Sequence, residues 1–315
     1  MAPYDLAGRL VVGIASSALF DLTEADAVFR EEGEAGYRAY QEEHVDRTLE
    51  PGVAYPFIRR LLSLNDLGPV DDPLVEVIVL SRNDPDTGLR VMRSIQTHGL
   101  PITRAIFMQG RSPHRFMPAL NMSLFLSANE DDVREAVAAG LPAGYVLGSS
   151  SALSEDDAED RDLRIAFDFD GVLADDAAEQ IYQTGGLDTF RSHEHTHAGT
   201  PHLPGPLRDF LAGVNRVQQR EEERRRRDPD YRIRVHVSLV TARNAPAHER
   251  AVRSLKNWGV TVNDAFFLGG IDKGAIIGVL KPHIFFDDQM SHLAGPSRNT
   301  PSVHVPFGKA NERLG

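Results

Sequence analysis

The second half of this chain repeats the pattern of the first half, and this repeat constrains the fold more than any other feature. A shift of 153 positions aligns the early parts of the halves, and a shift of 160 positions aligns the later parts. A chain of 315 residues is long enough to bury two cores. We therefore expect two copies of one unit, residues 1–152 and 153–315, with the junction in the acidic stretch 149–162. The aligned pairs include Gly33 with Gly186, His44 with His197, Pro51-Gly52 with Pro204-Gly205, Ser94 with Ser254, Gly99 with Gly259 and Phe107 with Phe267.

Each copy alternates short apolar runs with patterns of helical spacing. The runs have the length and flanking residues of buried parallel strands, and Gly99 and Gly259 close two of the helical patterns. This alternation predicts an α/β fold with parallel sheets, whose ligand sites lie at the carboxyl ends of the strands. The expected strands are 10–14, 75–80, 105–108 and 124–126, then 163–167, 235–240, 265–268 and 284–286; the expected helices are 87–98 and 246–258.

Composition excludes several classes of partner. The formal charge of −12 opposes binding to a nucleic acid polymer, which requires a basic surface. No apolar run approaches the roughly 18 residues of a membrane span, and the first residues do not resemble a secretory signal. Cys is absent, so disulfides and thiol chemistry are excluded. We expect a cytoplasmic protein with no membrane partner.

Polar side chains follow all four expected strands of the second copy. Asp168 and Asp170 follow the first strand, Thr241 ends the second, Lys273 follows the third, and Asp287-Asp288 end the fourth. Carboxylates that meet at one sheet edge repel one another unless a cation lies among them. Mg²⁺ prefers hard oxygen ligands and commonly binds beside a phosphate, whose oxygens the lysine and the threonine hydroxyl would contact. We therefore expect a Mg²⁺ and phosphate site at this edge.

The first copy lacks these groups. Ala15 and Ser17 stand where the second copy has its first two acids, and Pro113 replaces the lysine. Ser127-Ala128 replace the acids after the fourth strand, and only Ser81 preserves the hydroxyl of the threonine. The first copy cannot support the same chemistry, so we expect it to be a structural partner or a binding lobe.

The four polar features, in this order and each after a strand, resemble the motifs of the haloacid-dehalogenase (HAD) superfamily. The resemblance implies two tandem HAD-like Rossmannoid units, of which the first is degenerate and the second is catalytic. Asp168 would be a nucleophile that forms an aspartyl-phosphate, and Asp170 would be the general acid and base of a phosphatase. Thr241 and Lys273 would hold the phosphoryl group. The implied Mg²⁺ ligands are Asp168, Asp170, Asp287 and Asp288.

The segment between the first two motifs, about 175–230, is where this superfamily inserts its cap, and we expect a small helical cap that covers the site. Residues 193–197 formally match the His-Glu-x-x-His pattern of zinc proteases. The repeat argues against that interpretation, because only His197 has a histidine partner, His44, in the first copy. A shared structural or substrate-facing role fits both histidines better.

Over nearly its full length the chain is similar to the cytosolic 5′-nucleotidase I family, notably in 12–21, 239–243, 281–290 and 304–308. The resemblance implies Mg-dependent hydrolysis of nucleoside 5′-monophosphates to nucleoside and phosphate, and homo-oligomers. Two alternatives stay open: a phosphatase of sugar phosphates or other small phosphomonoesters, and a regulator that binds nucleotides without catalysis. The implied substrate contacts are Phe169, Thr241, Ala242, Arg243, Lys273, His197 and His44.

Overall fold

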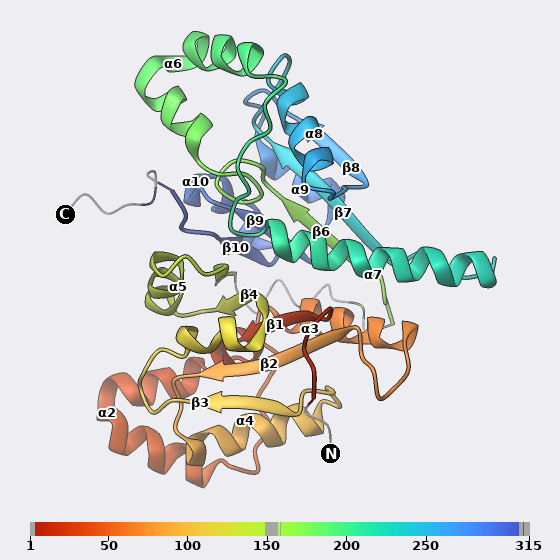
Figure 1. The fold of residues 1–315 in the computed structure, drawn as a ribbon. Helices are drawn as coiled ribbons and strands as arrows, with labels where there is room; N and C mark the ends of the chain where they lie inside the picture. Colours follow the sequence, from red (N-terminus) through yellow and green to blue (C-terminus); the bar gives the residue numbers. More distant parts are fainter. Residues whose placement is uncertain (1–3, 149–156, 158, 309–310, 312–315) are drawn as a thin grey trace. The chain divides into compact units, whose positions relative to one another are not determined.

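The computed structural model describes residues 4–148, 157, 159–308 and 311. The chain divides into two compact units, Met1–Asp156 and Asp157–Gly315. The expected boundary between residues 152 and 153 lies outside the described residues. Both units are mixed α/β with parallel strand pairing (Figure 1), which confirms the expected fold class at this level.

Unit 1 has the strand order β3-β2-β1-β4-β5. Its central strand β1 is buried at every residue, as expected for the apolar sequence of a strand covered on both faces. Its elements are β1 (Leu10–Ile14), α1 (Ser16–Leu19), α2 (Thr23–Glu43), α3 (Tyr55–Ser63), η1 (Leu64–Leu67), β2 (Val75–Ser81), α4 (Pro85–Thr97), β3 (Arg104–Phe107), η2 (His114–Phe116), η3 (Pro118–Leu120), β4 (Met122–Ser127), α5 (Glu130–Ala138) and β5 (Ala143–Leu147).

Unit 2 has the matching strand order β8-β7-β6-β9-β10. Phe167 and Phe286 stack in its core on the adjacent central strands, with ring centroids 5.1 Å apart. Its elements are β6 (Leu163–Phe167), α6 (Ala177–Thr196), α7 (Arg208–Arg227), β7 (Val235–Thr241), α8 (His248–Asn257), β8 (Asp264–Phe267), α9 (Lys273–Leu280), β9 (Ile284–Asp287), α10 (Met290–Leu293), η5 (Pro296–Arg298) and β10 (Ser302–His304).

The helices begin and end at residues whose chemistry explains the boundaries. Asp84 caps α4 by accepting a hydrogen bond from the Thr87 N–H at 2.8 Å, and Pro85 occupies the first helical position. Gly99 and Gly259 follow α4 and α8 with φ of 67° and 68°, a left-handed conformation that terminates helices. All eight expected strands are present, within two residues of their expected ends.

Specific contacts recur at equivalent positions of the two units. The Ser94 hydroxyl accepts a hydrogen bond from the Leu49 N–H at 2.9 Å, and the Ser254 hydroxyl accepts one from the His202 N–H at the same distance. These pairs obey the two shifts found in the sequence, 160 and 153 positions. The likeness therefore extends from strand order to individual hydrogen bonds.

Both units carry a bent helix at the same place, α2 in unit 1 and α6 in unit 2. Gly33 interrupts α2 with φ 72° and ψ −164°, and Gly186 interrupts α6 with φ 71° and ψ −176°. This backbone conformation is open to glycine and strained for other residues. The bend of α6 is visible in Figure 1.

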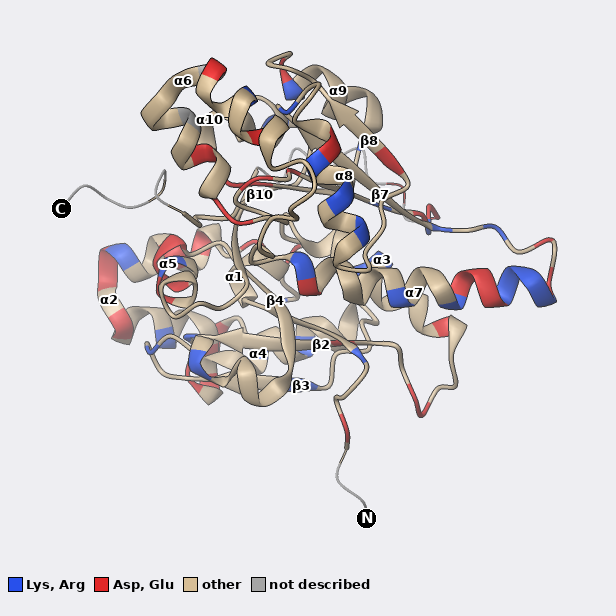
Figure 2. Cartoon of the chain, turned by 45° about the horizontal axis from the view of Figure 1, so that its top comes forward, with Lys and Arg blue, Asp and Glu red and all other residues tan. Residues whose placement is uncertain are grey.

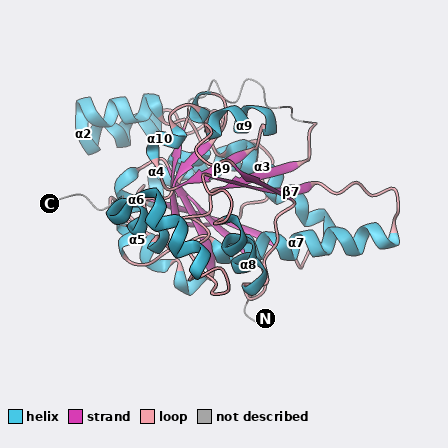
Figure 3. Cartoon of the chain, turned by 90° about the horizontal axis from the view of Figure 1, so that it is seen from above, coloured by secondary structure: helices cyan, strands magenta, loops and turns pink. Residues whose placement is uncertain are grey.

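The segment expected to form a cap divides into two parts of different character. Helix α7 packs on the sheet of unit 2, with the Phe210 ring centroid 6.0 Å from that of Phe167 and 5.9 Å from that of Phe286. Its charged C-terminal half extends beyond the strands of the unit (Figures 2 and 3). The expected cap range of about 175–230 therefore contains α6 and its following loop together with a helix that packs on the sheet.

Candidate active site

A buried lysine lies between two aspartates at the carboxyl edge of the unit 2 sheet. Asp168 directly follows β6 and Asp287 ends β9, and these strands are parallel neighbours, so both carboxylates emerge at the same edge. Lys273 is the first residue of α9, whose N-cap is Asp272. The Lys273 Nζ lies 2.8 Å from Asp168 Oδ2 and 2.6 Å from Asp287 Oδ2. Three residues from separate motifs thus form one cluster.

Burial and mutual charge set the protonation of this cluster. Burial raises the pKa of Asp168 to about 6, against the charge of Lys273, which lowers it. Burial also acts to raise the pKa of Asp287, but the Lys273 charge and the hydrogen bond with His292 outweigh it, so that pKa is lowered. The two carboxylates keep the pKa of Lys273 above its usual value, despite the opposing effect of burial. A protonated lysine therefore faces at least one ionised carboxylate at neutral pH.

Asp288 is buried beside this cluster without complete hydrogen bonding. Its Oδ1 has no hydrogen-bond partner. Its side chain lies against Gly171, where a Cβ would come within 2.7 Å of the Asp288 Cγ. Burial, followed by the charge of Asp168, raises the Asp288 pKa to about 9. A buried carboxyl with an unpartnered oxygen next to other acids is the environment that a bound cation would compensate.

The residues that best satisfy metal-ligand spacing differ in part from those expected. Asp168, Asp287 and His292 each offer an atom within 4.8 Å of the others. The His292 Nδ1 lies 3.1 Å from Asp287 Oδ1. Sequence reasoning missed His292, which lies on α10 a few residues beyond the last acidic pair and shows no spacing pattern of its own.

Asp170 is held by an arginine rather than pointing into the acidic cluster. Arg243 donates two hydrogen bonds to its carboxylate, Nε to Oδ2 at 2.8 Å and Nη2 to Oδ1 at 2.7 Å. This two-point arrangement fixes both the position and the plane of the carboxylate. The Arg243 side chain is 2% exposed, so little of its surface is open to a ligand.

A second buried carboxylate anchors the same arginine. Glu194 on α6 forms ion pairs with Arg243 and, at 2.7 Å, with Arg250 on α8, and it lies 3.2 Å from His202 Nε2. Burial opposes the ionisation of Glu194, but the bonds to His202 and Arg243 outweigh it and hold its pKa below the usual range. The carboxylates of Asp170 and Glu194 raise the pKa of Arg243, despite the opposing effect of burial. A continuous polar chain therefore runs from α6 through Arg243 to Asp170.

Sequence reasoning missed these polar contacts, although the repeat contained a signal of them. The unit 1 pair that corresponds to Glu194 and Arg250 is Gln41 and Arg90, which are joined by a hydrogen bond of 3.1 Å. The repeat aligns Gln41 with Glu194, but the sequence around Glu194 also matches a zinc-protease pattern. Its carboxylate is instead taken up by arginines.

The remaining expected substrate contacts occupy varied surroundings. Thr241 is buried at the end of β7, where its hydroxyl accepts from the Arg243 N–H at 3.2 Å, and Ala242 is exposed. Phe169 is fully buried and stacks on Trp258 with centroids 6.0 Å apart, so packing accounts for its contacts. His197 ends α6 with its Nδ1 2.9 Å from the His193 carbonyl.

His44 occupies the equivalent position in unit 1, at the end of α2. Its Nδ1 lies 2.8 Å from the Tyr40 carbonyl, and its ring stacks on Tyr40 with centroids 4.2 Å apart. His197 stacks on His193 in the same way, with centroids 4.1 Å apart. The two histidines thus occupy equivalent helix-terminal positions and make equivalent contacts in the two units.

The carboxyl edge of this α/β sheet thus presents a buried aspartate, a lysine and further acids, which are groups that could hold a phosphoryl group and a cation. A model of the 5′-nucleotidase family matches residues 2–312. The chain is 30% identical over 305 residues to human cytosolic 5′-nucleotidase 1B, covering 95% of this chain and 49% of that protein. It thus spans about half the length of this curated relative. The chain belongs to the 5′-nucleotidase family.

Two further comparisons complete the description. No solved structure is significantly similar to the chain. None of the helices in the described part of the chain is long and apolar enough to cross a membrane.

Proposed function

We propose that the chain is a 5′-nucleotidase, which hydrolyses nucleoside 5′-monophosphates to nucleoside and phosphate. Membership of the family supports the reaction class. The single structural observation that carries the proposal is the buried cluster of Asp168, Lys273 and Asp287. It combines a carboxylate nucleophile with a fixed positive charge for phosphoryl oxygens.

In this proposal Asp168 begins the reaction. Its carboxylate attacks phosphorus, the bond from phosphorus to the 5′ oxygen breaks, and an aspartyl-phosphate forms. Lys273, already within hydrogen-bond distance of Asp168, stabilises the negative charge on the phosphoryl oxygens. The Thr241 hydroxyl, at the end of the neighbouring strand, is positioned to bind one of these oxygens.

Asp170 moves the protons in both halves of the reaction. In its protonated form it donates a proton to the departing 5′ oxygen, which leaves as the nucleoside hydroxyl. The resulting carboxylate then takes a proton from the water that attacks phosphorus, which releases phosphate and restores Asp168. Because Arg243 pairs with the ionised carboxylate, this pair must loosen when Asp170 carries its proton. We assign Arg243 as a positioning residue because its two hydrogen bonds orient the Asp170 carboxylate.

The acidic groups fit a divalent cation of the Mg²⁺ type. The unpartnered Asp288 oxygen and the grouping of Asp168, Asp287 and His292 support this assignment. When bound, Mg²⁺ would supply positive charge that offsets the negative charge of the phosphoryl oxygens. Asp168, Asp287 and Asp288 are the residues that we propose to hold it, with the backbone carbonyl of Asp170.

We also propose that the two units are tandem HAD-like copies, the first without catalytic acids. The matching strand orders and the recurrent serine and arginine contacts support this interpretation. Helix α6 and its following loop would act as the cap, linked to the site through Glu194. Cytoplasmic location and homo-oligomerisation belong to the same proposal, by analogy with the family.

A substrate panel tests the proposed function. Phosphate release would be measured with Mg²⁺ for purine and pyrimidine nucleoside 5′-monophosphates and for several sugar phosphates. We expect release from the nucleotides. Release confined to sugar phosphates would contradict the substrate class and retain the mechanism, and no release from any phosphomonoester would favour a non-catalytic nucleotide-binding regulator.

A further inference from the structure

Unit 1 has a cavity of about 680 Å³ at the carboxyl edge of its sheet. Its lining includes Ser17 after β1, Asn83 after β2, Gly110 after β3 and Asn129 after β4. These are the strand ends at which unit 2 carries its acids, arginine and lysine. The cavity is therefore the counterpart of the candidate active site, in the unit that lacks catalytic groups.

The cavity is open because shorter side chains replace the ionic chain of unit 2. Ser17 takes the position of Asp170, and Asn83 takes the position of Arg243. Arg243 is long enough to reach Asp170 and Glu194 together, whereas an asparagine side chain cannot bridge such a gap. Ser17 and Asn83 therefore fill less space at this edge than Asp170 and Arg243 do in unit 2.

The charges around the cavity disfavour a phosphorylated ligand. Arg38 is paired with Asp84 at 2.7 Å, and Arg82 is paired with Asp132 at 2.6 Å. Pro113 stands where unit 2 has its lysine. The lining also includes Asp26 and Glu34, so that carboxylates outnumber guanidinium groups on it. A phosphate dianion would meet net repulsion here.

The cavity instead offers an aromatic wall and unsatisfied hydrogen-bond donors. Phe29 and Tyr37 on α2 meet edge to face with ring centroids 5.8 Å apart, and Phe29 is 51% exposed. The Asn83 Oδ1 accepts from the Tyr37 hydroxyl at 3.3 Å, while its buried Nδ2 has no hydrogen-bond partner. The buried Nη2 of Arg82 forms no hydrogen bond, but it lies 3.7 Å from the Glu135 carboxylate. Buried donors of this kind are stabilised by a ligand that supplies acceptors.

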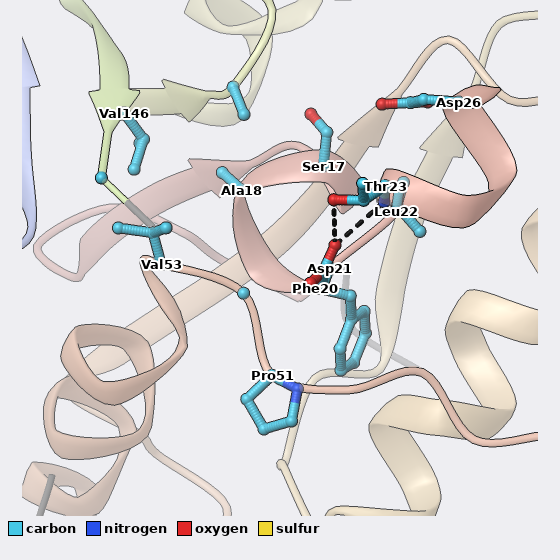
Figure 4. A pocket seen from close by; sticks show the side chains of 13 residues that line it. Ser17, Ala18, Phe20, Asp21, Leu22, Thr23, Asp26, Pro51, Val53 and Val146 are labelled. Carbon is cyan, nitrogen blue, oxygen red and sulfur yellow. Dashed lines mark hydrogen bonds between the residues drawn. The ribbon is translucent and has the colours of Figure 1, made fainter. Parts of the chain in front are cut away.

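A second pocket of about 390 Å³ adjoins the cavity and shares Ser17, Leu22, Asp26 and Ala128 with it. Figure 4 shows Ser17 and Asp26 on one side of this pocket and Pro51 on the opposite side. Hydroxyl and carboxylate groups here can accept hydrogen bonds from the hydroxyls of a sugar. A ligand with a ring at one end and hydroxyls at the other matches the two parts.

We propose that this cavity of unit 1 binds an uncharged molecule of the nucleoside class in preference to its phosphorylated form. The aromatic wall and the unpartnered Asn83 amide suit a planar ring with polar edges, the hydroxyl and carboxylate groups suit a ligand with hydroxyls, and the excess of carboxylates opposes a phosphate. The choice of a nucleoside among such molecules rests on the proposed function, because that reaction releases one.

The test uses the full chain with Asp168→Asn, so that no nucleotide is consumed. Calorimetric titrations with adenosine, uridine and their 5′-monophosphates would be compared with and without Phe29→Ala. Phe29 is half exposed, so its loss should leave the fold intact, and the equally exposed Leu89→Ala outside the lining is the matched control. We expect nucleoside affinity to fall about tenfold in Phe29→Ala and to be unchanged in Leu89→Ala.

Two results would overturn the proposal. One is a nucleoside affinity that is equal in the Phe29→Ala and Leu89→Ala proteins, or absent in both. The other is a monophosphate whose affinity depends on Phe29 as strongly as that of the nucleoside. Nucleotide hydrolysis by the otherwise wild-type Phe29→Ala protein separates the claims. Intact hydrolysis without Phe29-dependent binding contradicts this inference alone, and Phe29-dependent binding without any hydrolysis by the wild type contradicts the proposed function alone.

Discussion

At the scale of single residues, the buried Asp288 carboxyl gives a test of metal binding that does not depend on activity. Because its pKa is raised to about 9, the folded protein keeps a proton that the unfolded chain releases, and stability falls as pH rises from about 4 toward 9. Asp288→Asn removes this loss of stability. Without metal at pH 8, the free energy of unfolding of the variant should exceed that of the wild type by about 1 to 3 kcal/mol, and its melting temperature should be higher.

Mg²⁺ should raise the melting temperature of the wild type and leave that of Asp288→Asn nearly unchanged. Thermal denaturation with EDTA and with Mg²⁺ measures both effects. Asp209→Asn, a change at a largely exposed carboxylate, is the control and should behave as the wild type. An equal Mg²⁺-induced shift in the wild type and Asp288→Asn would remove Asp288 from the metal site.

Arg243 separates a positioning role from direct substrate contact. Arg243→Lys keeps the charge but loses the two-point pair with Asp170. We expect kcat to fall by about tenfold to a hundredfold with little change in KM, because a misplaced Asp170 loses part of the roughly 10²- to 10⁴-fold that proton transfer contributes. Steady-state kinetics beside Arg253→Lys, which alters an exposed ion pair, provide the comparison. A raised KM with unchanged kcat would instead indicate that Arg243 contacts substrate, as the family resemblance implies.

At the scale of elements, Glu194 fastens α6 to the rest of unit 2. Its pKa is lowered in the folded state, so its contribution to stability is full above the unfolded pKa of about 4.3 and is lost as pH falls below it. Glu194→Gln should cost roughly 3 kcal/mol at pH 7, since it leaves two buried arginines short of negative charge. The difference from wild type should shrink in acid below about pH 4.

Urea denaturation across pH 3 to 8 would measure this dependence. The exposed pair of Glu222 and Arg225 supplies the control, because Glu222→Gln should change the free energy of unfolding by less than about 1 kcal/mol. A Glu194→Gln protein as stable as the wild type at neutral pH would show that α6 is not held through this carboxylate.

The loop after α6 depends on a glycine at a close backbone approach. A Cβ at Gly205 would lie 2.3 Å from the Ala174 carbonyl oxygen, whereas a Cβ at Gly199 in the same loop would meet nothing within 4 Å. Gly205→Ala should therefore destabilise the protein by about 1 to 3 kcal/mol, and Gly199→Ala should not. Chemical denaturation of the two variants decides this, and equal stabilities would contradict the described path of the loop.

Apolar runs and helix-ending glycines predicted eight strands and the helices α4 and α8. The central strands β1, β2, β6 and β7 are largely buried, and Gly99 and Gly259 follow the two helices. The edge strands β5 and β10 were not expected. β10 spans only Ser302–His304, and β5 contains Gly144, so neither shows the long apolar run of a central strand. The packing of Phe210 of α7 on the sheet was not predicted, because it depends on tertiary contacts that spacing alone does not indicate.

At the scale of the whole molecule, two units of similar fold differ in the acids at the ends of their strands. The residues that distinguish them were visible in the sequence, since Ala15 and Ser17 replace Asp168 and Asp170. The contacts of Glu194, Arg243 and His292 were not, because they join residues far apart in the chain whose pairing leaves no local pattern. The repeat could indicate which unit carries the acids, but only the structure shows how they are arranged.

Asp168 is proposed to be the nucleophile that accepts the phosphoryl group, and unit 2 to be the catalytic unit. The most direct measurement is a rapid acid quench of the enzyme with a nucleoside 5′-monophosphate labelled in its phosphate, followed by peptide mapping. If Asp168 forms an aspartyl-phosphate, the peptide that contains Asp168 carries the label. The Asp168→Asn protein then shows neither label nor significant phosphate release. Equal phosphate release by the wild type and Asp168→Asn, with no label on that peptide, would contradict this role of Asp168.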